Sequence, residues 1–287
     1  MNSTNNMLAN FSELEKNNAI KKLWNDIKKS SDITTQHEPK AYMIGGQPGA
    51  GKTRSTEKLE EQYDYNILKI DMDDYREFHP NYEQINQVYG KEASLYTNKF
   101  AAEVRDAIMK RALDNKYNVI IDGTMKSHAL AEKQINQLEK AGYSIETRIY
   151  TCSKELSLQG IENRYQKSIT EGEIPRYVPK EFHDSVLIEL PKTIDKLYQS
   201  GKIKIVEVYN RQEKLYDSRI DKGLPSVSIQ NEINKNENKL SQNSSVKSQD
   251  DIFAKALQTA HQKIENKRLI SNENSINKGM NKGIIQI

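Results

Sequence analysis

Residues 46–53 read Gly46-Gln47-Pro48-Gly49-Ala50-Gly51-Lys52-Thr53 and match the pattern G-x-x-x-x-G-K-[ST] at every fixed position. An apolar run precedes this stretch, and a segment of helical character follows it. In that context the glycines let the backbone turn tightly and direct its N–H groups at an anion from the start of the helix. The stretch therefore predicts a phosphate-binding loop between the first strand of a sheet and the next helix.

The loop also predicts which groups bind a nucleotide. Lys52 would bridge the β- and γ-phosphates, and the Thr53 hydroxyl would coordinate the Mg²⁺ that neutralises the same oxygens. ATP or GTP with Mg²⁺ is thus the expected cofactor set. Such a loop does not by itself distinguish a kinase from a GTPase or a motor ATPase. The candidate nucleotide-binding residues are Gly46, Gln47, Pro48, Gly49, Ala50, Gly51, Lys52 and Thr53.

Short apolar runs alternate with helical patterns after residue 40. Apolar positions recur on one face of residues 96–113 and of residues 129–141, as in amphipathic helices. Strands too apolar to face water, alternating with helices, predict a parallel sheet covered on both faces. The expected fold class is α/β, a P-loop NTPase-type parallel sheet flanked by helices. The expected strands are 41–44, 66–70, 118–121, 145–150 and 203–209.

Three segments are expected along the chain. Residues 1–40 would form an N-terminal helix and a linker, because a capping-box pattern precedes apolar residues at helical spacing. The helix is expected to pack on the domain's own core, with partner binding as the alternative. Residues 41–220 would form the domain that carries the loop. Residues 221–287 indicate a polar, mostly disordered tail with a short helix near 250–268.

Composition limits the partners and the compartment. The formal net charge of the 287 residues is only +3, which does not demand a nucleic-acid partner. Residues 231–248 carry interspersed acids and no aromatic residue, which disfavours a nucleic-acid arm. A single cysteine, Cys152, rules out an internal disulfide and fits a reducing cytoplasm. No run of about eighteen apolar residues occurs, so no membrane span is expected.

Acidic residues follow two of the expected strands. Asp71, Asp73 and Asp74 come directly after the second strand, and Asp122 ends the third. Open α/β sheets build their sites at the carboxyl ends of the strands, so these groups are expected near the loop. An Asp of the first cluster can take the proton of an attacking hydroxyl, and Asp122 can hold a metal-bound water or a substrate hydroxyl. The alternative for the first cluster is a solvated acidic turn.

Arg164 and Arg176 flank the polar segment 165–175. A lid of this kind would bring two guanidinium groups onto the phosphoryl group in transfer, where negative charge develops. The alternative is that each arginine lies on a polar surface. Together with the loop and the carboxylates, the two arginines favour a small-molecule kinase over a passive nucleotide binder.

The order of these motifs resembles the zeta toxins, bacterial kinases of toxin–antitoxin systems. The matches extend from about residue 41 to residue 211, and their combined order is more specific than any single motif. They comprise residues 46–53, Asp73-Asp74-Tyr75-Arg76, His79-Pro80-Asn81-Tyr82, residues 117–124, Arg164-Tyr165, Arg176 with Pro179-Lys180, His183-Asp184 and Tyr209-Asn210-Arg211.

The resemblance implies a kinase that phosphorylates the 3′-hydroxyl of the sugar in UDP-N-acetylglucosamine. Asp73 resembles the catalytic base of the family, and Lys52, Arg164 and Arg176 resemble its phosphate-binding residues. Zeta toxins are held inactive by a small antitoxin that blocks the nucleotide site, so a comparable partner is expected. The resemblance gives Thr53 as metal ligand and, as substrate-binding residues, Asp106, Asp122, Thr124 and Lys126.

The acceptor residues depart from the family pattern. Where the family has Glu-Gly-Thr followed closely by Arg, this chain has Asp122-Gly123-Thr124 and Lys126, and Asp106 replaces a common Glu. Losing one methylene moves a carboxylate by about 1.5 Å, and Lys lacks the two-pronged donor of Arg. A kinase for another acceptor, such as a dinucleotide or a nucleoside, is therefore one alternative. A non-catalytic nucleotide-binding module is the other.

Overall fold

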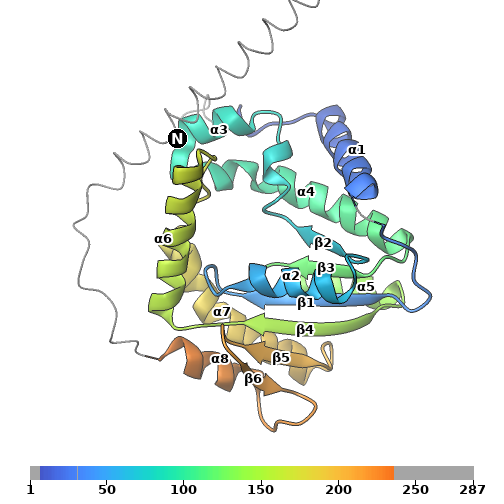
Figure 1. The fold of residues 1–287 in the computed structure, drawn as a ribbon, viewed down its shortest axis with the longest axis vertical. Coiled ribbons are helices and arrows are strands. Elements are labelled where there is room, and N and C mark those ends of the chain that lie inside the picture. The colour runs from blue at the N-terminus through green and yellow to red at the C-terminus, as the bar shows by residue number, and fades with distance from the viewer. Residues whose placement is uncertain (1–6, 31, 236–287) are drawn as a thin grey trace, which may run out of the picture. The chain divides into compact units, whose positions relative to one another are not determined.

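A six-stranded sheet forms the centre of the fold in the computed structural model, which describes residues 7–30 and 32–235. The strand order is β2-β3-β1-β4-β5-β6, so β1 lies between β3 and β4 (Figure 1). The strands are β1 Lys40–Gly46, β2 Leu68–Asp71, β3 Val119–Asp122, β4 Ser144–Tyr150, β5 Val206–Tyr209 and β6 Lys214–Asp217.

The strands β1 to β5 run parallel, as the sequence predicts. β1 pairs with β3 and β4, β2 pairs with β3, and β4 pairs with β5. β6 pairs with β5 in antiparallel register, so the sheet is mixed rather than entirely parallel. The sequence did not predict β6 because its four residues, KLYD, form no apolar run.

Helices connect the strands, and the helices expected at 96–113 and 129–141 correspond to α4 and α5. Within the described ranges, none of the helices is both long and apolar enough to cross a membrane. The α-helices are α1 Glu13–Ser30, α2 Lys52–Gln62, α3 Tyr82–Tyr89, α4 Ala93–Asp114, α5 His128–Lys140, α6 Lys154–Glu171, α7 Lys180–Gln199 and α8 Pro225–Ile233, and the 3₁₀ helices are η2 Arg76–Phe78 and η3 Gly90–Glu92.

The chain divides into two compact units. The larger unit contains the whole sheet, and its described residues extend up to Glu162 and resume at Tyr177. The described part of the smaller unit is Asn163–Arg176, which comprises the end of α6 and the stretch that follows it. The phosphate-binding loop and the carboxylates after β2 and β3 all belong to the larger unit.

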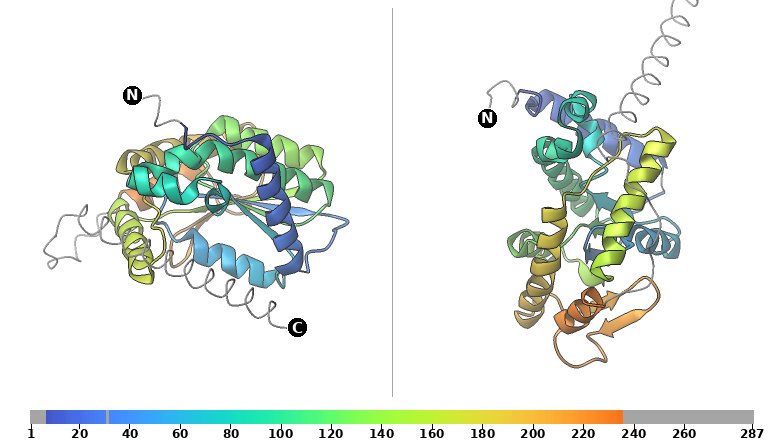
Figure 2. Two further views of the ribbon diagram at one scale, coloured as in Figure 1. Left: turned by 90° about the horizontal axis from the view of Figure 1, so that it is seen from above. Right: turned by 90° about the vertical axis from the view of Figure 1, so that its left-hand side faces the viewer.

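Apolar side chains cover both faces of the sheet. On one face, Met43 of β1 and Ile121 of β3 belong to a core shared with α4, α5 and α7. On the other face, Ile44 of β1 and Ile120 of β3 pack with Leu59 of α2. Figure 2 shows α2 on the side of the sheet opposite α4 and α5. Since successive side chains of a strand alternate between faces, β1 and β3 need apolar residues at consecutive positions to fill both cores.

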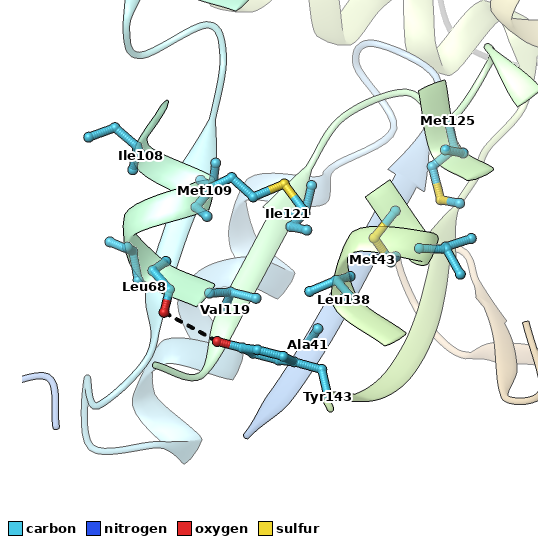
Figure 3. Close-up of a cluster of buried hydrophobic side chains, with 14 of the residues drawn as sticks. Ala41, Met43, Leu68, Ile108, Met109, Val119, Ile121, Met125, Leu138 and Tyr143 are labelled. Atoms are coloured by element: carbon cyan, nitrogen blue, oxygen red, sulfur yellow. Dashed lines mark hydrogen bonds between the residues drawn. The ribbon is translucent and has the colours of Figure 1, made fainter. Parts of the chain in front are cut away.

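The larger core contains a buried tyrosine whose hydroxyl is satisfied (Figure 3). Tyr143 packs among side chains that include Met43, Val119 and Leu138. Its hydroxyl donates to the carbonyl of Tyr117 at 2.7 Å, and a second contact reaches a carbonyl of α4 at 3.3 Å. A buried hydroxyl without partners would destabilise the core, so these bonds are what permit a tyrosine at this position.

The N-terminal helix α1 packs on the core of the domain. Ser12 and Glu15 form the expected capping box, with the Glu15 amide 3.2 Å from Ser12 Oγ and the Glu15 carboxylate 2.7 Å from the Ser12 amide. Ala19, Ile20 and Trp24 on one face of the helix are buried in the larger core. The expectation that the helix packs on its own domain is therefore confirmed.

The boundary expected at residue 220 leaves out a packed helix. α8 begins with Pro225, and its Ile229 is fully buried against the larger core. The helix also contacts α7, so the packed fold continues beyond the start of the expected tail. The short helix expected near 250–268 and the rest of the expected tail lie outside the described residues.

Replacing Trp24 tests how firmly α1 is docked. Trp24→Ala should lower the free energy of unfolding by about 3–5 kcal/mol, because the ring is buried and stacks on Tyr117 at a centroid distance of 6.0 Å. Leu14→Ala, in the same helix but with a side chain 70% exposed, is the matched control and should change it by less than about 0.5 kcal/mol. Chemical denaturation measures both, and equal effects would contradict the docking of α1.

Candidate functional site

The phosphate-binding loop joins β1 to α2 at the carboxyl edge of the sheet. Gly49 has a φ of 80°, in the left-handed region that glycine adopts at little cost. A Cβ at Gly49 would lie only 2.1 Å from the carbonyl oxygen of Ser157 in α6. Gly51 is the N-cap of α2, so the positive end of that helix meets the loop. The loop thus has the turn and the helix N-terminus that an anion site requires.

Lys52 and Thr53 lie in the first turn of α2. The ammonium of Lys52 donates to the carbonyl of Gly46 at 3.3 Å, so the side chain lies back over the loop. Thr53 is exposed. An ammonium and an accessible hydroxyl at a helix N-terminus suit phosphate oxygens and a hard cation.

Gln47 anchors the loop to the end of β4. Its side chain is fully buried, and its amide nitrogen donates to the carbonyl of Cys152 at 2.7 Å. Among the described residues, the buried amide oxygen of Gln47 has no hydrogen-bond partner. The Ala50 amide donates to the Gln47 carbonyl at 3.2 Å, which closes the turn. The side chain of Gln47 therefore fixes the loop to the segment that follows β4.

Asp71 and Asp122 end the neighbouring strands β2 and β3 and are paired in register. Asp122 is also in register with Ile44 of β1, two residues before the loop begins. On the other side, Lys69 pairs with Asp71 at 3.4 Å and with Asp74 at 3.1 Å. The carboxyl edge of the sheet therefore places Asp122 on the strand next to the phosphate-binding loop and Asp71 one strand further along the sheet.

Burial shifts the protonation of both carboxyl groups. Burial raises the pKa of Asp122 to about 6, and the nearby ammonium of Lys52 opposes that rise. Burial and the neighbouring Asp74 and Asp73 raise the pKa of Asp71. Ionising both groups at neutral pH is costly, and a bound cation would offset that cost. Perturbed carboxyl groups of this kind are typical of functional sites.

Asp73 lies in the turn after β2. Its amide donates to the Asp71 carboxylate at 2.9 Å, which shapes the turn. Its own carboxylate accepts from Arg76 Nε at 2.8 Å, while the side chain stays 53% exposed. Arg76 is buried and also donates to the Ser94 carbonyl and the Thr97 hydroxyl of α4. Arg76, which lies in η2 and is anchored to α4, therefore orients Asp73, whose side chain stays partly exposed.

Asp106 on α4 is held by two cationic side chains. Arg105 donates to it at 2.7 and 3.0 Å, and Lys133 of α5 donates at 3.0 Å. Although burial opposes them, these bonds hold the pKa of Asp106 below its ordinary value. Arg105 also approaches the sulfur of Met72 at 3.8 Å. Asp106 is thus linked through Arg105 to the turn that carries Asp73.

Thr124 and Lys126 both follow β3 but have different neighbours. The carbonyl of Thr124 accepts from the Gly46 amide at 3.4 Å, so Thr124 lies beside the loop. The Lys126 ammonium donates to Ser185 of α7 at 2.9 Å and lies 4.1 Å from the ring centre of Phe182. Lys126 is therefore engaged with α7.

Arg164 and Arg176 belong to the smaller compact unit. Arg164 lies on α6, and Arg176 lies in the stretch between α6 and α7. The polar segment between them is helical up to Glu171. Their action on a transferred phosphoryl group stays a prediction.

The larger unit brings Lys52, Thr53, Asp122 and Thr124 together at the sheet edge, whereas Asp106 and Lys126 are bound by neighbouring helices. Sequence reasoning gave no role to Arg76, although a cation three residues after Asp73 is a signal for a helical ion pair. It also left Asp71 as one member of an acidic cluster, because only the strand register pairs it with Asp122.

A mainly parallel sheet with this loop after β1 and acids at the ends of β2 and β3 defines a P-loop kinase-type fold. The family model described as Zeta toxin matches residues 24–221. The chain belongs to the Zeta toxin family, which confirms the resemblance seen in its motifs. Family and fold together support a phosphotransferase.

Relatives match over most of their length. Toxin zeta of Streptococcus pyogenes is 28% identical over 200 residues, which cover 69% of this chain and 70% of that protein. Toxin PezT of Streptococcus pneumoniae serotype 4 is 30% identical over 184 residues, which cover 63% and 73%.

Two solved structures show the same fold. A structure from the PezAT chromosomal toxin–antitoxin system of Streptococcus pneumoniae has a TM-score of 0.70 at 22% identity, covering 90% of this chain and 98% of that one. An AvrRxo1-ORF1:-ORF2 complex has a TM-score of 0.56 at 12% identity, covering 88% and 87%.

The raised pKa of Asp122 predicts a pH-dependent stability. The pKa of Asp122 is about 6 in the folded state and 3.8 for an ordinary Asp. Between these two pH values the folded state binds more protons than the unfolded state, so the folded state loses stability as pH rises. Relative to Asp122→Asn, wild type should lose roughly 2–3 kcal/mol of unfolding free energy between pH 3.5 and pH 8. Denaturation without nucleotide or Mg²⁺ measures this, and parallel pH profiles for the two proteins would contradict the shift.

Proposed function

We propose that this chain is an ATP- or GTP-dependent kinase that phosphorylates the sugar 3′-hydroxyl of UDP-N-acetylglucosamine. The proposal is carried by one observation: the phosphate-binding loop with Lys52 lies next to the strand that ends in Asp122, which is paired in register with Asp71. Family membership supports the reaction class, and the motifs shared with the zeta toxins support the acceptor.

The nucleotide would bind with its phosphates in the loop. Backbone amides at the start of α2 and the ammonium of Lys52 would hold the β- and γ-phosphates. The donor set also fits Mg²⁺, because the Thr53 hydroxyl and the desolvated Asp122 carboxylate offer the hard oxygen ligands that this cation prefers. When bound, Mg²⁺ would supply charge neutralisation at the phosphate oxygens.

Asp73 is the proposed general base. The acceptor oxygen would form a bond to the γ-phosphorus, its proton would pass to the Asp73 carboxylate, and the bond from the γ-phosphorus to the β,γ-bridging oxygen would break to release ADP or GDP. The bond from Arg76 Nε orients Asp73 for this role. Arg164 and Arg176 would stabilise the charge that develops on the transferred group.

The acceptor is the part of the proposal in which this chain departs most from its family. Asp106, Asp122, Thr124 and Lys126 are the proposed substrate contacts. Since Lys126 is engaged with Ser185 and Asp106 with two cations, each would have to exchange a partner to reach an acceptor. A dinucleotide or a nucleoside is therefore the second candidate acceptor.

A non-catalytic nucleotide-binding module is a weaker candidate. A passive binder has no use for an accessible carboxylate that a buried arginine orients, as Arg76 orients Asp73. Such a module would bind nucleotide tightly and would transfer phosphate to none of the acceptors.

A small antitoxin is the proposed protein partner. The PezAT system to which one structural neighbour belongs is described as a toxin–antitoxin system, and a second neighbour was solved as a complex of two proteins. Such a partner would block the nucleotide site.

Transfer of labelled phosphate tests the kinase. With labelled ATP and Mg²⁺, UDP-N-acetylglucosamine should become labelled, and its 3-deoxy analogue should not. Asp73→Asn should lower kcat by about 10²–10⁴-fold, because the proton acceptor is lost. Asp74→Asn is the matched control, since Asp74 pairs with Lys69 instead and should change kcat by no more than about threefold.

Two results would count against the kinase. Label in no acceptor, including nucleosides and dinucleotides, would remove the proposed activity. Equal loss in the Asp73 and Asp74 variants would remove the assignment of the base.

Affinity purification of the tagged Asp73→Asn chain from its native host tests the partner. A small protein should co-purify with the chain. Because it would compete with nucleotide for the same site, excess MgATP should release it, or the complex should bind less MgATP than the chain alone. Retention of full nucleotide binding in the complex would contradict a block of the nucleotide site.

A further inference from the structure

Arg211 lies in the turn between β5 and β6, yet it contacts the phosphate-binding loop 162 residues away in sequence. The turn is fixed by Asn210, whose side-chain oxygen accepts from the amides of Gln212 and Glu213, each at 2.8 Å. The Asn210 amide donates to the Glu213 carbonyl at 3.0 Å. The backbone of Arg211 is therefore held independently of any ligand.

The guanidinium of Arg211 binds two backbone carbonyls, one in the loop and one in α6. Its Nη2 donates to the Gly49 carbonyl at 2.6 Å and to the Leu156 carbonyl of α6 at 3.3 Å. The stem of the side chain crosses Gly51, where a Cβ would lie 3.5 Å from Arg211 Cγ. One side chain thus ties the loop to the first turn of α6.

The bond falls on a peptide that follows a glycine. Gly49 has a φ of 80° and no Cβ, so its own conformation resists rotation of the peptide between Gly49 and Ala50 only weakly. Two hydrogen bonds hold this peptide, one from the Ala50 amide to the Gln47 carbonyl and one from Arg211 to the Gly49 carbonyl. Rotation would turn the Gly49 carbonyl, a negative dipole end, toward the space that phosphates need. A hydrogen bond from a charged donor is about twice as strong as a neutral one, and it holds this carbonyl outward.

We propose that Arg211 is a positioning residue of the nucleotide-binding loop, which fixes the Gly49–Ala50 peptide in the orientation that accepts a nucleoside triphosphate. The inference rests on the proposed function, because it presumes that the loop binds a nucleotide. Arg211 acts through Gly49 and is not itself assigned a contact with the reacting atoms.

Gly160 of α6 provides the space for this arrangement. A Cβ at Gly160 would lie 2.8 Å from the Gly49 carbonyl oxygen and 2.9 Å from Arg211 Nη2. Glycine inside a helix is otherwise unfavourable, so the missing side chain needs a reason of this kind. Gly160→Ala should therefore disturb the same bond from the opposite side, without removing a charge.

Titration calorimetry of MgATP into the full-length chain tests the role. Arg211→Met should raise the Kd for MgATP about tenfold or more, as expected for loss of a charge-assisted hydrogen bond. Arg211→Lys should give an intermediate Kd, and Gly160→Ala should weaken binding in the same direction. Arg111→Met, an identical change at an arginine that lies over Trp24, is the matched control and should bind as wild type.

Kinetics and thermal unfolding complete the test. In Arg211→Met, the KM for ATP should rise while the KM for the acceptor and the melting temperature without nucleotide stay near wild type. Unchanged MgATP affinity in Arg211→Met would overturn the inference and leave the proposed function intact. Weaker MgATP binding in Arg211→Met together with wild-type binding in Gly160→Ala would have the same consequence. Failure of the wild-type chain to bind MgATP would overturn the proposed function, and the inference with it.

Discussion

The contact between Gly49 and Ser157 constrains the rest of the site. A side chain at Gly49 would collide with the Ser157 carbonyl, so the loop and the first turn of α6 can only approach through glycine. Ser157 is fixed from behind, because its hydroxyl lies 2.8 Å from the buried His183 of α7, whose other ring nitrogen lies 3.1 Å from Asp184. The pair His183-Asp184 therefore supports the phosphate-binding loop through α6, which gives a physical reason for its place among the motifs.

Charge at the sheet edge is unbalanced in the free protein. The N-terminus of α2 and Lys52 favour an anion, while Asp71 and Asp122 are desolvated and favour a cation. A triphosphate with a divalent cation would satisfy both at once, the phosphates at the loop and the cation at the carboxylates. Under the proposed function, the raised pKa of Asp122 follows from burying a carboxylate where a cation would bind.

Sequence periodicity predicted the parts of the fold in which burial forces a pattern. The central strands β1 and β3 have buried apolar side chains on both faces, so they read as apolar runs, and α4 and α5 show one apolar face. β6 and α8 were not predicted from the sequence, because an edge strand and a short helix bury few side chains and so show no clear apolar pattern. At the site, the loop was predictable because its chemistry is local. The pairing of Asp71 with Asp122 depends on strand register, and the contact of Arg211 with Gly49 joins residues far apart in sequence, so neither could be predicted.

The nucleotide side and the acceptor side of the site are held by different kinds of group. The loop is fixed by side chains that bind backbone carbonyls, Gln47 that of Cys152 and Arg211 that of Gly49, and these contacts depend little on what the substrate is. The acceptor candidates Asp106 and Lys126 are held by side chains on α4, α5 and α7, and these partners can be exchanged or replaced. A family can therefore keep its phosphate chemistry while its acceptor changes, because substitutions such as Glu to Asp or Arg to Lys alter only the second set of contacts.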